Sequence, residues 1–174
     1  MNKLAGVLFG IPVGIMLFVF AVYLFARSGF APVTTTATAL PMEHFLAKTA
    51  LHAKMDSEYP REVPVKPDRQ TFLAGASVYR ENCAVCHGVP GGVQNSIAAG
   101  MFPRPPQLFE AKDMVTDDPP GETFWKEKYG IRLSGMPGFS GELSDEQMWQ
   151  VGVLLSSADK LDPLVKQAIA ASTK

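Results

Sequence analysis

The segment Cys83-Ala84-Val85-Cys86-His87 joins the side chains with the most distinctive chemistry in this sequence. Two thiols three positions apart lie on one helical turn, where they can bond to the two vinyl groups along one edge of a porphyrin. The imidazole that follows directly can bind the iron at the porphyrin centre. The spacing C-x-x-C-H therefore predicts one covalently attached haem c, bound through Cys83 and Cys86, with His87 as an iron ligand.

Two other uses of such a motif fit this sequence less well. A redox-active cysteine pair of the thioredoxin type requires a strand–helix–strand context, and no segment here alternates with the period of strands. A zinc site requires four ligands, and only His44 and His52 remain to complete one. We expect these two histidines to be surface or packing residues instead.

The sixth coordination position of a haem iron separates electron carriers from catalysts and sensors. The methionines that follow the motif are Met101, Met114, Met136 and Met148. Met136 lies between Gly135 and Pro137, and glycine and proline there allow a rigid backbone to approach the porphyrin closely. Met148 falls on the apolar face of an expected helix and is most simply a core residue. We therefore expect His87 and Met136 to hold the iron.

Four helices are expected to position these residues in an all-α domain. Their bounds follow from cap and stop residues: a helix from Asp68 through Tyr79, a second from Asp118 and Pro119 to Gly130, a third opened by a Ser144–Gln147 capping box, and a fourth from Asp162 through Ile169. Because no segment has the period of two, we expect no strands.

The first 27 residues have the composition of a membrane anchor. From Leu4 to Ala26 there are 23 residues without a charge, and a helix of that length spans about 35 Å, enough to cross a hydrocarbon core of about 30 Å. The apolar part of a removed signal is shorter, about 7–15 residues. We therefore expect residues 1–27 to be an uncleaved single transmembrane helix in the lipid bilayer.

A stripe of small residues lies along this anchor. Gly6, Gly10 and Gly14 recur every four residues on one helix face, which allows a partner helix of a larger membrane complex to approach closely. The alternative is that glycine is simply common in membrane helices, and Pro12 blurs the stripe by kinking the span.

Residues 28–67 are expected to connect the anchor to the haem domain, residues 68–174. A threonine-rich tether comes first. Pro41 then opens an amphipathic linker helix that ends near Asp56 and lies on the membrane surface or packs on the soluble domain. The prolines between Tyr59 and Arg69 favour an extended spacer.

Taken together, the motifs resemble those of the class I monohaem cytochromes c, in particular the membrane-anchored bacterial ones. The resembling features, from Phe72 to about Leu155, are the C-x-x-C-H motif, Phe102-Pro103-Arg104-Pro105-Pro106, Phe124-Trp125 and Gly130-Ile131-Arg132-Leu133-Ser134-Gly135-Met136-Pro137. The resemblance implies a small helical bundle with one exposed haem edge, which transfers single electrons and is not an enzyme.

The resemblance also implies how the haem is held. The first and last core helices of such proteins cross closely, and we expect Gly75 and Trp149 to face each other at this crossing. A backbone carbonyl of Pro103, Pro105 or Pro106 would accept the Nδ1–H of His87, which fixes the ring.

Donors to the haem propionates are expected by the same analogy, and the candidates are Arg104, Trp125 and Arg132. The alternative is two solvated arginines and a core tryptophan. Covalent haem attachment in bacteria takes place outside the cytoplasmic membrane. The family therefore implies an inner-membrane protein with residues 28–174 in the periplasm.

The charge balance bears on the partners. The net charge is −1 without a basic block, which excludes nucleic acid as an expected partner. Residues 71–174 hold 9 Lys and Arg against 12 Asp and Glu, unlike strongly basic carriers. A local basic patch could be formed by Lys126, Lys128 and Arg132. Because Glu127 interrupts it, the simpler interpretation is a solvated helix face.

Three functions remain open at this point. The first is a carrier whose anchor keeps it near its redox protein partners at the membrane. The second is a fixed subunit of a respiratory or photosynthetic membrane complex. The third differs in class: a haem enzyme or gas sensor with an open sixth iron position.

Overall fold

The structure is a computed structural model that describes residues 3–171, with side chains from residue 7 onward. It divides into two compact units, Met1–Pro41 and Met42–Lys174. The sequence predicts that the haem domain begins at residue 68. In the structure the segment from Met42 to Pro67 belongs to the same compact unit as the motif.

The first unit contains helix α1 (Lys3–Arg27). Its part Val7–Arg27 has a mean hydropathy of 2.5 and no buried residues, which suits a membrane span, although signal sequences share these features. A side chain added at Gly10 or Gly14 would meet no other atom within 4 Å. Gly6 precedes the part of α1 whose side chains are described.

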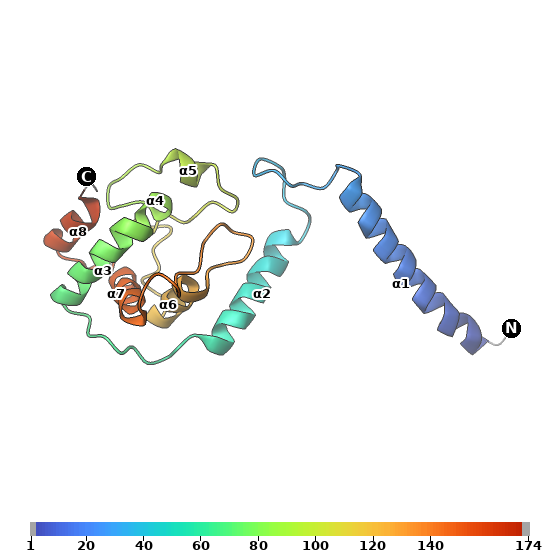
Figure 1. Cartoon of the computed structure of the whole chain (residues 1–174), viewed down its shortest axis with the longest axis horizontal. Coiled ribbons are helices and arrows are strands. Elements are labelled where there is room, and N and C mark those ends of the chain that lie inside the picture. Colours follow the sequence, from blue (N-terminus) through green and yellow to red (C-terminus); the bar gives the residue numbers. More distant parts are fainter. Residues whose placement is uncertain (1–2, 172–174) are drawn as a thin grey trace. The chain divides into compact units, whose positions relative to one another are not determined.

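The second unit consists of helices joined by loops (Figure 1). Its helices are α2 (Glu43–Glu58), α3 (Arg69–Asn82), α4 (Ala84–His87), α5 (Ser96–Ala99), α6 (Pro120–Tyr129), α7 (Asp145–Ser156) and α8 (Pro163–Ala170). Within residues 3–171 the only β pairing is an isolated antiparallel bridge between Ile131 and Met136. The all-α prediction is confirmed, while the short helices α4 and α5 were not expected as separate elements.

Three expected helix caps are present. The Asp68 carboxylate accepts a hydrogen bond from the Thr71 N–H at 2.9 Å, which opens α3. Ser144 and Gln147 form both hydrogen bonds of a capping box at the start of α7. The Asp162 carboxylate accepts from the backbone of Leu164 and Val165. Each cap satisfies N–H groups that the first helical turn leaves unpaired.

Two helix starts differ from the prediction. Helix α6 has Pro119 at its N-cap and begins at Pro120, while the carboxylate of Asp118 lies outside it, 3.6 Å from Lys126 Nζ. Helix α2 begins at Glu43 and not at Pro41, because Met42 has a left-handed backbone with φ 66° that no α-helix accommodates.

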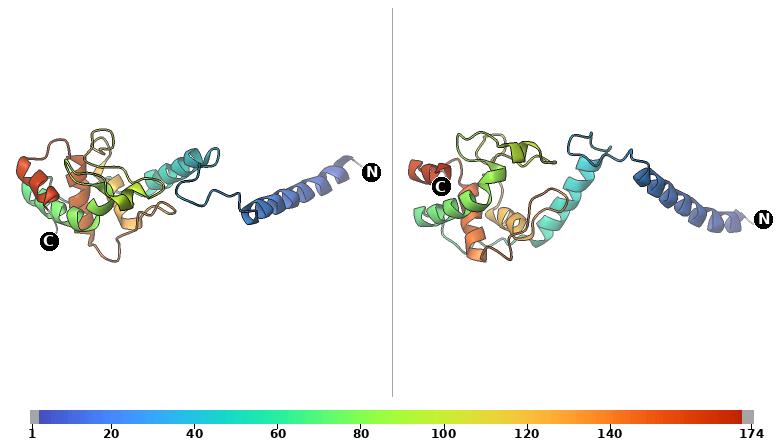
Figure 2. Two further views of the ribbon diagram at one scale, coloured as in Figure 1. Left: turned by 90° about the horizontal axis from the view of Figure 1, so that it is seen from above. Right: turned by 45° about the horizontal axis from the view of Figure 1, so that its top comes forward.

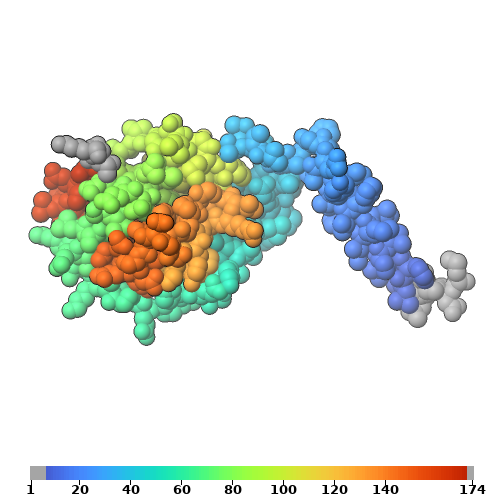
Figure 3. Space-filling model, viewed as in Figure 1, coloured from blue at the N-terminus to red at the C-terminus, as the bar shows by residue number. Residues whose placement is uncertain are grey.

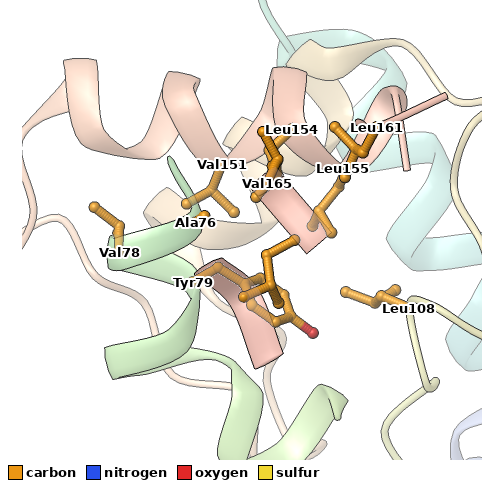
Figure 4. Packing of buried hydrophobic residues seen from close by; sticks show 10 residues of the cluster. Ala76, Val78, Tyr79, Leu108, Val151, Leu154, Leu155, Leu161 and Val165 are labelled. Atoms are coloured by element: carbon orange, nitrogen blue, oxygen red, sulfur yellow. The ribbon is translucent and has the colours of Figure 1, made fainter. Parts of the chain in front are cut away.

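The core forms where α3, α7 and α8 meet, and Figure 4 shows the side chains of α3 and α7 directed at one another. The buried cluster consists of Ala76, Val78, Tyr79, Leu108, Val151, Leu154, Leu155, Leu161, Val165 and Ile169. Both views of Figure 2 place α8 beside α3. A side chain on Gly75 would overlap the Gln150 carbonyl, so the two helices touch through backbone.

The expected crossing of α3 and α7 is therefore present, but Gly75 faces the backbone of Gln150 and Val151, not Trp149. Trp149 is 5% exposed and stacks on Phe124 of α6, with ring centroids 4.5 Å apart. The tryptophan thereby joins α7 to α6.

Helix α2 packs against α6 through a small separate cluster. Met55 is fully buried, and it groups with Tyr59 and with Trp125 of α6. A side chain on Gly121 would overlap the Pro60 carbonyl, so the chain after α2 also lies directly on α6. Of the two roles expected for the linker helix, the structure shows packing on the haem domain.

Candidate functional site

The C-x-x-C-H motif follows α3 without a break. Cys83 is the C-cap of α3 and the N-cap of α4. The His87 N–H donates to the Cys83 carbonyl at 2.9 Å. The motif therefore forms one helical turn, as its spacing predicts, and both cysteines are free thiols that can form thioethers.

The motif opens on a cavity of about 280 Å³. Its lining comes from α3, α4, α6, α7 and the loops around residues 101–108 and 131–139, and includes the site candidates Cys83, Cys86, His87, Arg104 and Met136. Trp125 and Arg132 line a neighbouring cavity of about 1160 Å³ between α6, the following loop and α2. In the space-filling view that loop (light orange) lies beside α2 (cyan) (Figure 3).

The imidazole of His87 is fixed by the proline-rich loop. Its Nδ1 lies 2.9 Å from the carbonyl oxygen of Pro106, one of the three expected acceptors. A proton on Nδ1 that is donated to this carbonyl leaves Nε2 as the free metal-binding atom. Burial lowers the pKa of His87 and so favours the neutral form that ligates metals.

Gln107 ties this loop to the motif, and sequence analysis missed it. Its side-chain amide donates to the Cys86 carbonyl at 3.0 Å and to the Pro105 carbonyl at 3.2 Å, and its side chain is buried. Gly88 makes room for it, since a side chain there would meet the Gln107 Oε1 atom at 2.5 Å. A single amide after three prolines offers no periodic signal by which the sequence could reveal this role.

The loop after α6 holds Met136 in the cavity. Gly130 ends α6 with φ +68°, and Gly135 has φ +77° just before the methionine. The Ile131 N–H donates to the Met136 carbonyl at 3.1 Å, and the Ser134 hydroxyl accepts from the Met136 N–H at 3.3 Å. These bonds close a tight turn, as the glycines and proline predict.

Of the other methionines, one shares the cavity. The thioether of Met101 lies 3.9 Å from the Cys86 thiol, and its methyl group lies where a side chain on Gly135 would stand. Met148 is fully buried with Phe124 and Trp149, so its expected core role is confirmed. The structure therefore brings two thioethers, those of Met101 and Met136, toward the motif.

The expected propionate donors are divided between the two cavities. Arg104 lines the cavity of the motif. The indole N–H of Trp125 donates to the Glu58 carboxylate of α2 at 3.2 Å, and Trp125 is 6% exposed. Arg132 lines the neighbouring cavity. For Trp125 the structure thus shows a donor already bonded to a carboxylate of this chain.

Glu127 is the charged residue that sequence analysis placed wrongly. Flanked by Lys126 and Lys128, it was expected on a solvated helix face, yet it is 4% exposed and lines the cavity of the motif. Its Oε2 atom is buried without a hydrogen-bond partner. Burial raises the pKa of the Glu127 carboxyl well above its ordinary value.

Burial also raises the pKa of the Tyr79 hydroxyl and of the Cys83 thiol. The Tyr79 hydroxyl donates to the Gly88 carbonyl at 2.8 Å, and burial raises its pKa, so it stays a neutral donor. Burial, and next the nearby Glu127, raises the pKa of the Cys83 thiol.

Neither of the remaining histidines, His44 and His52, lines the cavity of the motif. His44 of α2 packs its ring against Phe102, with centroids 5.7 Å apart. Among the described residues no group of three or more His, Cys, Asp or Glu side chains is placed to hold a metal ion.

The donor set fits a haem c. Two thiols on one turn suit covalent attachment, and an imidazole with a bonded Nδ1 and a nearby thioether are the axial ligands of electron-transfer haems. An imidazole and a thioether are also poor ligands for hard cations, which prefer oxygen ligands.

Comparison with known proteins agrees with this donor set. Residues 70–154 match the family model described as cytochrome C oxidase, cbb3-type, subunit III. No curated protein sequence matches the chain. A solved structure with similarity belongs to the reducing HAO-like protein complex of Kuenenia stuttgartiensis, at 27% identity and a TM-score of 0.48, over 57% of this chain and 48% of that one. The chain thus spans about half the length of that relative.

Proposed function

Residues 70–154 form a class I c-type cytochrome domain, and from this premise we propose that the chain carries single electrons through one haem bound to Cys83 and Cys86, with His87 and Met136 as axial ligands. The observation that carries the proposal is that both thiols, the oriented imidazole and Met136 line one cavity. A c-type cytochrome domain implies covalent haem and electron transfer; the ligand set is our proposal.

The chain's own residues would prepare this site before the haem is bound. The Pro106 carbonyl keeps the His87 ring in one tautomer and one orientation, and Gln107 holds the loop that carries Pro106 against the motif. The turn from Gly130 to Pro137 presents Met136 from the opposite loop. Bound there, the haem supplies an iron that gains and loses one electron.

Apolar side chains form part of the cavity wall. Leu108 and Leu155 are buried at its wall, and Phe139 lies beside them. A site whose ligands are held rigidly needs little rearrangement when its charge changes. This favours transfer of electrons without chemistry at the iron.

Carbon monoxide tests directly whether both axial positions of the iron are occupied by protein ligands. We expect the absorption spectrum of the reduced full chain in detergent to stay unchanged when the gas is added, because His87 and Met136 fill both axial positions. Rapid binding to the unmodified protein would contradict the proposal. It would favour the other class, an enzyme or gas sensor with an open iron position.

We also propose that α1 anchors the haem domain on the periplasmic side of a bacterial inner membrane. The uncharged length of α1 supports a span, and covalent haem attachment supports the side. A fusion of alkaline phosphatase after Lys174 is expected to be active. An inactive fusion would contradict this topology, because the phosphatase needs disulfides that form only outside the cytoplasm.

A fixed place in a membrane complex is the second candidate. It is favoured by the description of the matching family model as a subunit of a cytochrome c oxidase, and by the open faces of Gly10 and Gly14. The mass of the haem-containing species extracted in mild detergent decides: one chain with its micelle indicates a tethered carrier, and a much larger species indicates a subunit.

Of the propionate donors, we propose Arg104 with the most direct support, because it lines the cavity of the motif. Arg132 and Trp125 stay predictions at the neighbouring cavity. Arg104→Gln removes a positive charge from the cavity wall, so it is expected to lower the reduction potential while leaving the haem attached.

A further inference from the structure

A buried carboxyl group shares the haem cavity and takes no part in the ligand set described above. Glu127 lies on the face of α6 that also presents Thr123, one helical turn earlier, and both line the cavity of the motif. The side chain is 4% exposed, and its Oε2 atom has no hydrogen-bond partner. Such a group is costly to bury as an ion unless a positive charge or donors stabilise it.

The lysines on either side of Glu127 do not neutralise it. Lys126 Nζ lies 3.6 Å from the carboxylates of Asp118 and Glu122. Lys128 Nζ lies 2.9 Å from the carboxylate of Asp145 at the start of α7. Both ammonium groups are thus paired with other acids, and the charge state of Glu127 is left to the contents of the cavity.

We propose that Glu127 is a redox-linked proton-binding site, at which the carboxylate takes up one proton from water when the iron gains an electron and releases it when the electron leaves. This inference rests on the proposed function. The balance is one electron from a one-electron donor protein and one proton from solvent, and no other bond forms or breaks.

The direction of the coupling follows from charge alone. The oxidised iron carries one more positive charge than the reduced iron, and it stabilises a nearby carboxylate. Reduction removes that charge, so the carboxyl group binds its proton more tightly. Because the raised pKa of Glu127 already favours the neutral form, the reduced state is the protonated one.

The cavity wall carries other titratable or charged groups. They are Tyr79 and Cys83 of α3, Cys86 and His87 of α4, Arg104 of the proline-rich loop and Lys126 of α6. The thiols become thioethers, His87 binds iron, and the Tyr79 hydroxyl donates to Gly88 with a raised pKa.

The two helices packed against α6 add no competing group. Helix α7 contributes only Leu155 to the cavity. The acidic group of α2 that faces α6 is Glu58, which bonds to Trp125 and pairs with Lys54 beside the neighbouring cavity. Glu127 is therefore the carboxyl group of this chain that the cavity encloses.

The test is the reduction potential of the haem-loaded full chain in detergent, measured by spectroelectrochemistry at a series of pH values between about 5 and 9. Coupled uptake of one proton makes the equilibrium constant change up to tenfold per pH unit, which for one electron is about 59 mV. We expect the potential to decrease as pH rises in part of this range.

Two variants with the same change of charge isolate the group. Glu127→Gln keeps the shape of the side chain, and we expect it to abolish the pH dependence. Glu142→Gln removes an exposed carboxylate and is expected to keep it. A wild-type potential that is constant with pH overturns the proposal. An unchanged slope in Glu127→Gln also overturns it, because the proton would then bind elsewhere, for example at a haem propionate.

A second measurement does not depend on a variant. The redox-difference infrared spectrum of the unmodified protein should gain the carbonyl band of a protonated carboxylic acid on reduction, and its absence would contradict the proposal. The proposed function fails separately: a haem that shows no reversible one-electron titration at any pH contradicts electron transfer, whereas a reversible, pH-independent one contradicts only the role of Glu127.

Discussion

Two contacts in the helical unit are each built around a glycine, and they differ in what surrounds that glycine. At Gly75, α3 meets the Gln150 carbonyl of α7 within a ten-residue buried cluster. At Gly121, α6 meets the Pro60 carbonyl beside a cluster of only Met55, Tyr59 and Trp125. The first contact positions the C-x-x-C-H motif directly, because Cys83 is the C-cap of α3.

The difference separates a haem-binding core from a helix docked onto it. The α3–α7 contact lies within the segment that matches the cytochrome family model, and α2 lies before that segment. Loss of the first contact should therefore remove the haem site. Loss of the second should free α2 and leave the ligands of the haem in place. Three substitutions test this, from the largest expected effect to the smallest.

Gly75→Ala should have the largest effect, because the added methyl group would overlap a backbone carbonyl that cannot turn away. Overpacking costs roughly 1–3 kcal/mol and more where backbone must move, so we expect a loss of about 3 kcal/mol or more in the free energy of unfolding. Denaturant unfolding followed by haem absorbance measures it.

The control for this substitution is Gly141→Ala, where an added side chain meets nothing within 4 Å. It should change the free energy of unfolding by no more than about 0.5 kcal/mol. Equal stabilities for the two variants would show that α3 and α7 do not need the close approach.

Met55→Ala should weaken the docking of α2 by an amount near the lower end of the range of about 2–5 kcal/mol for such truncations. The Met55 side chain is fully buried, but a small cluster can close around the gap. Hydrogen exchange should accelerate in α2 and stay slow in α3.

Phe45→Ala is the matched control on the same helix, because Phe45 is 64% exposed. It should leave exchange in α2 unchanged. If Met55→Ala instead loosened α3 and altered the haem spectrum, the two contacts would form one cooperative unit, and the proposed separation would be wrong.

Glu58→Gln should have the smallest effect, and one that depends on pH. The pKa of Glu58 is lowered from its ordinary value of 4.5, first by Lys54 and, against the opposing effect of burial, by the Trp125 N–H. A lowered folded-state pKa gives a contribution that is complete above the unfolded-state value and lost as pH falls through the folded-state value.

The docking of α2 should accordingly weaken on acidification below about pH 4.5 in the wild type. The Glu58→Gln variant should lack this particular dependence. Exchange rates in α2 between pH 3 and 6 measure it, and identical pH profiles for the two proteins would contradict a role for the carboxylate.

Local signals predicted helix ends and the turn of the motif well. The Asp68 cap, the Ser144–Gln147 capping box and the stop at Gly130 depend on neighbours in sequence, and the structure contains all three. The same holds for the turn of the C-x-x-C-H motif. For the acceptor of the His87 proton, the family resemblance narrowed the choice to three prolines, and the structure shows Pro106.

Contacts between distant segments were harder to predict. Glu127 stands between two lysines, and a ten-residue helix is too short for its periodicity to show that the glutamate faces inward. The contact between α2 and α6 includes a hydrogen bond between Trp125 and Glu58, which are 67 positions apart. The left-handed backbone of Met42, which moved the start of α2, has no local signature, since methionine rarely adopts it.

We propose above all that Met136 occupies the sixth coordination position of the iron. Met101, whose thioether lies in the same cavity, provides the matched control. Carbon monoxide is added to the reduced Met136→Ala and Met101→Ala proteins, and the reduction potential of each is measured. The account predicts that Met136→Ala binds the gas and has a lower potential, because a thioether ligand favours ferrous iron. Met101→Ala should behave as the wild type. Gas binding by Met101→Ala together with an unchanged Met136→Ala would contradict the account and assign the sixth position to Met101.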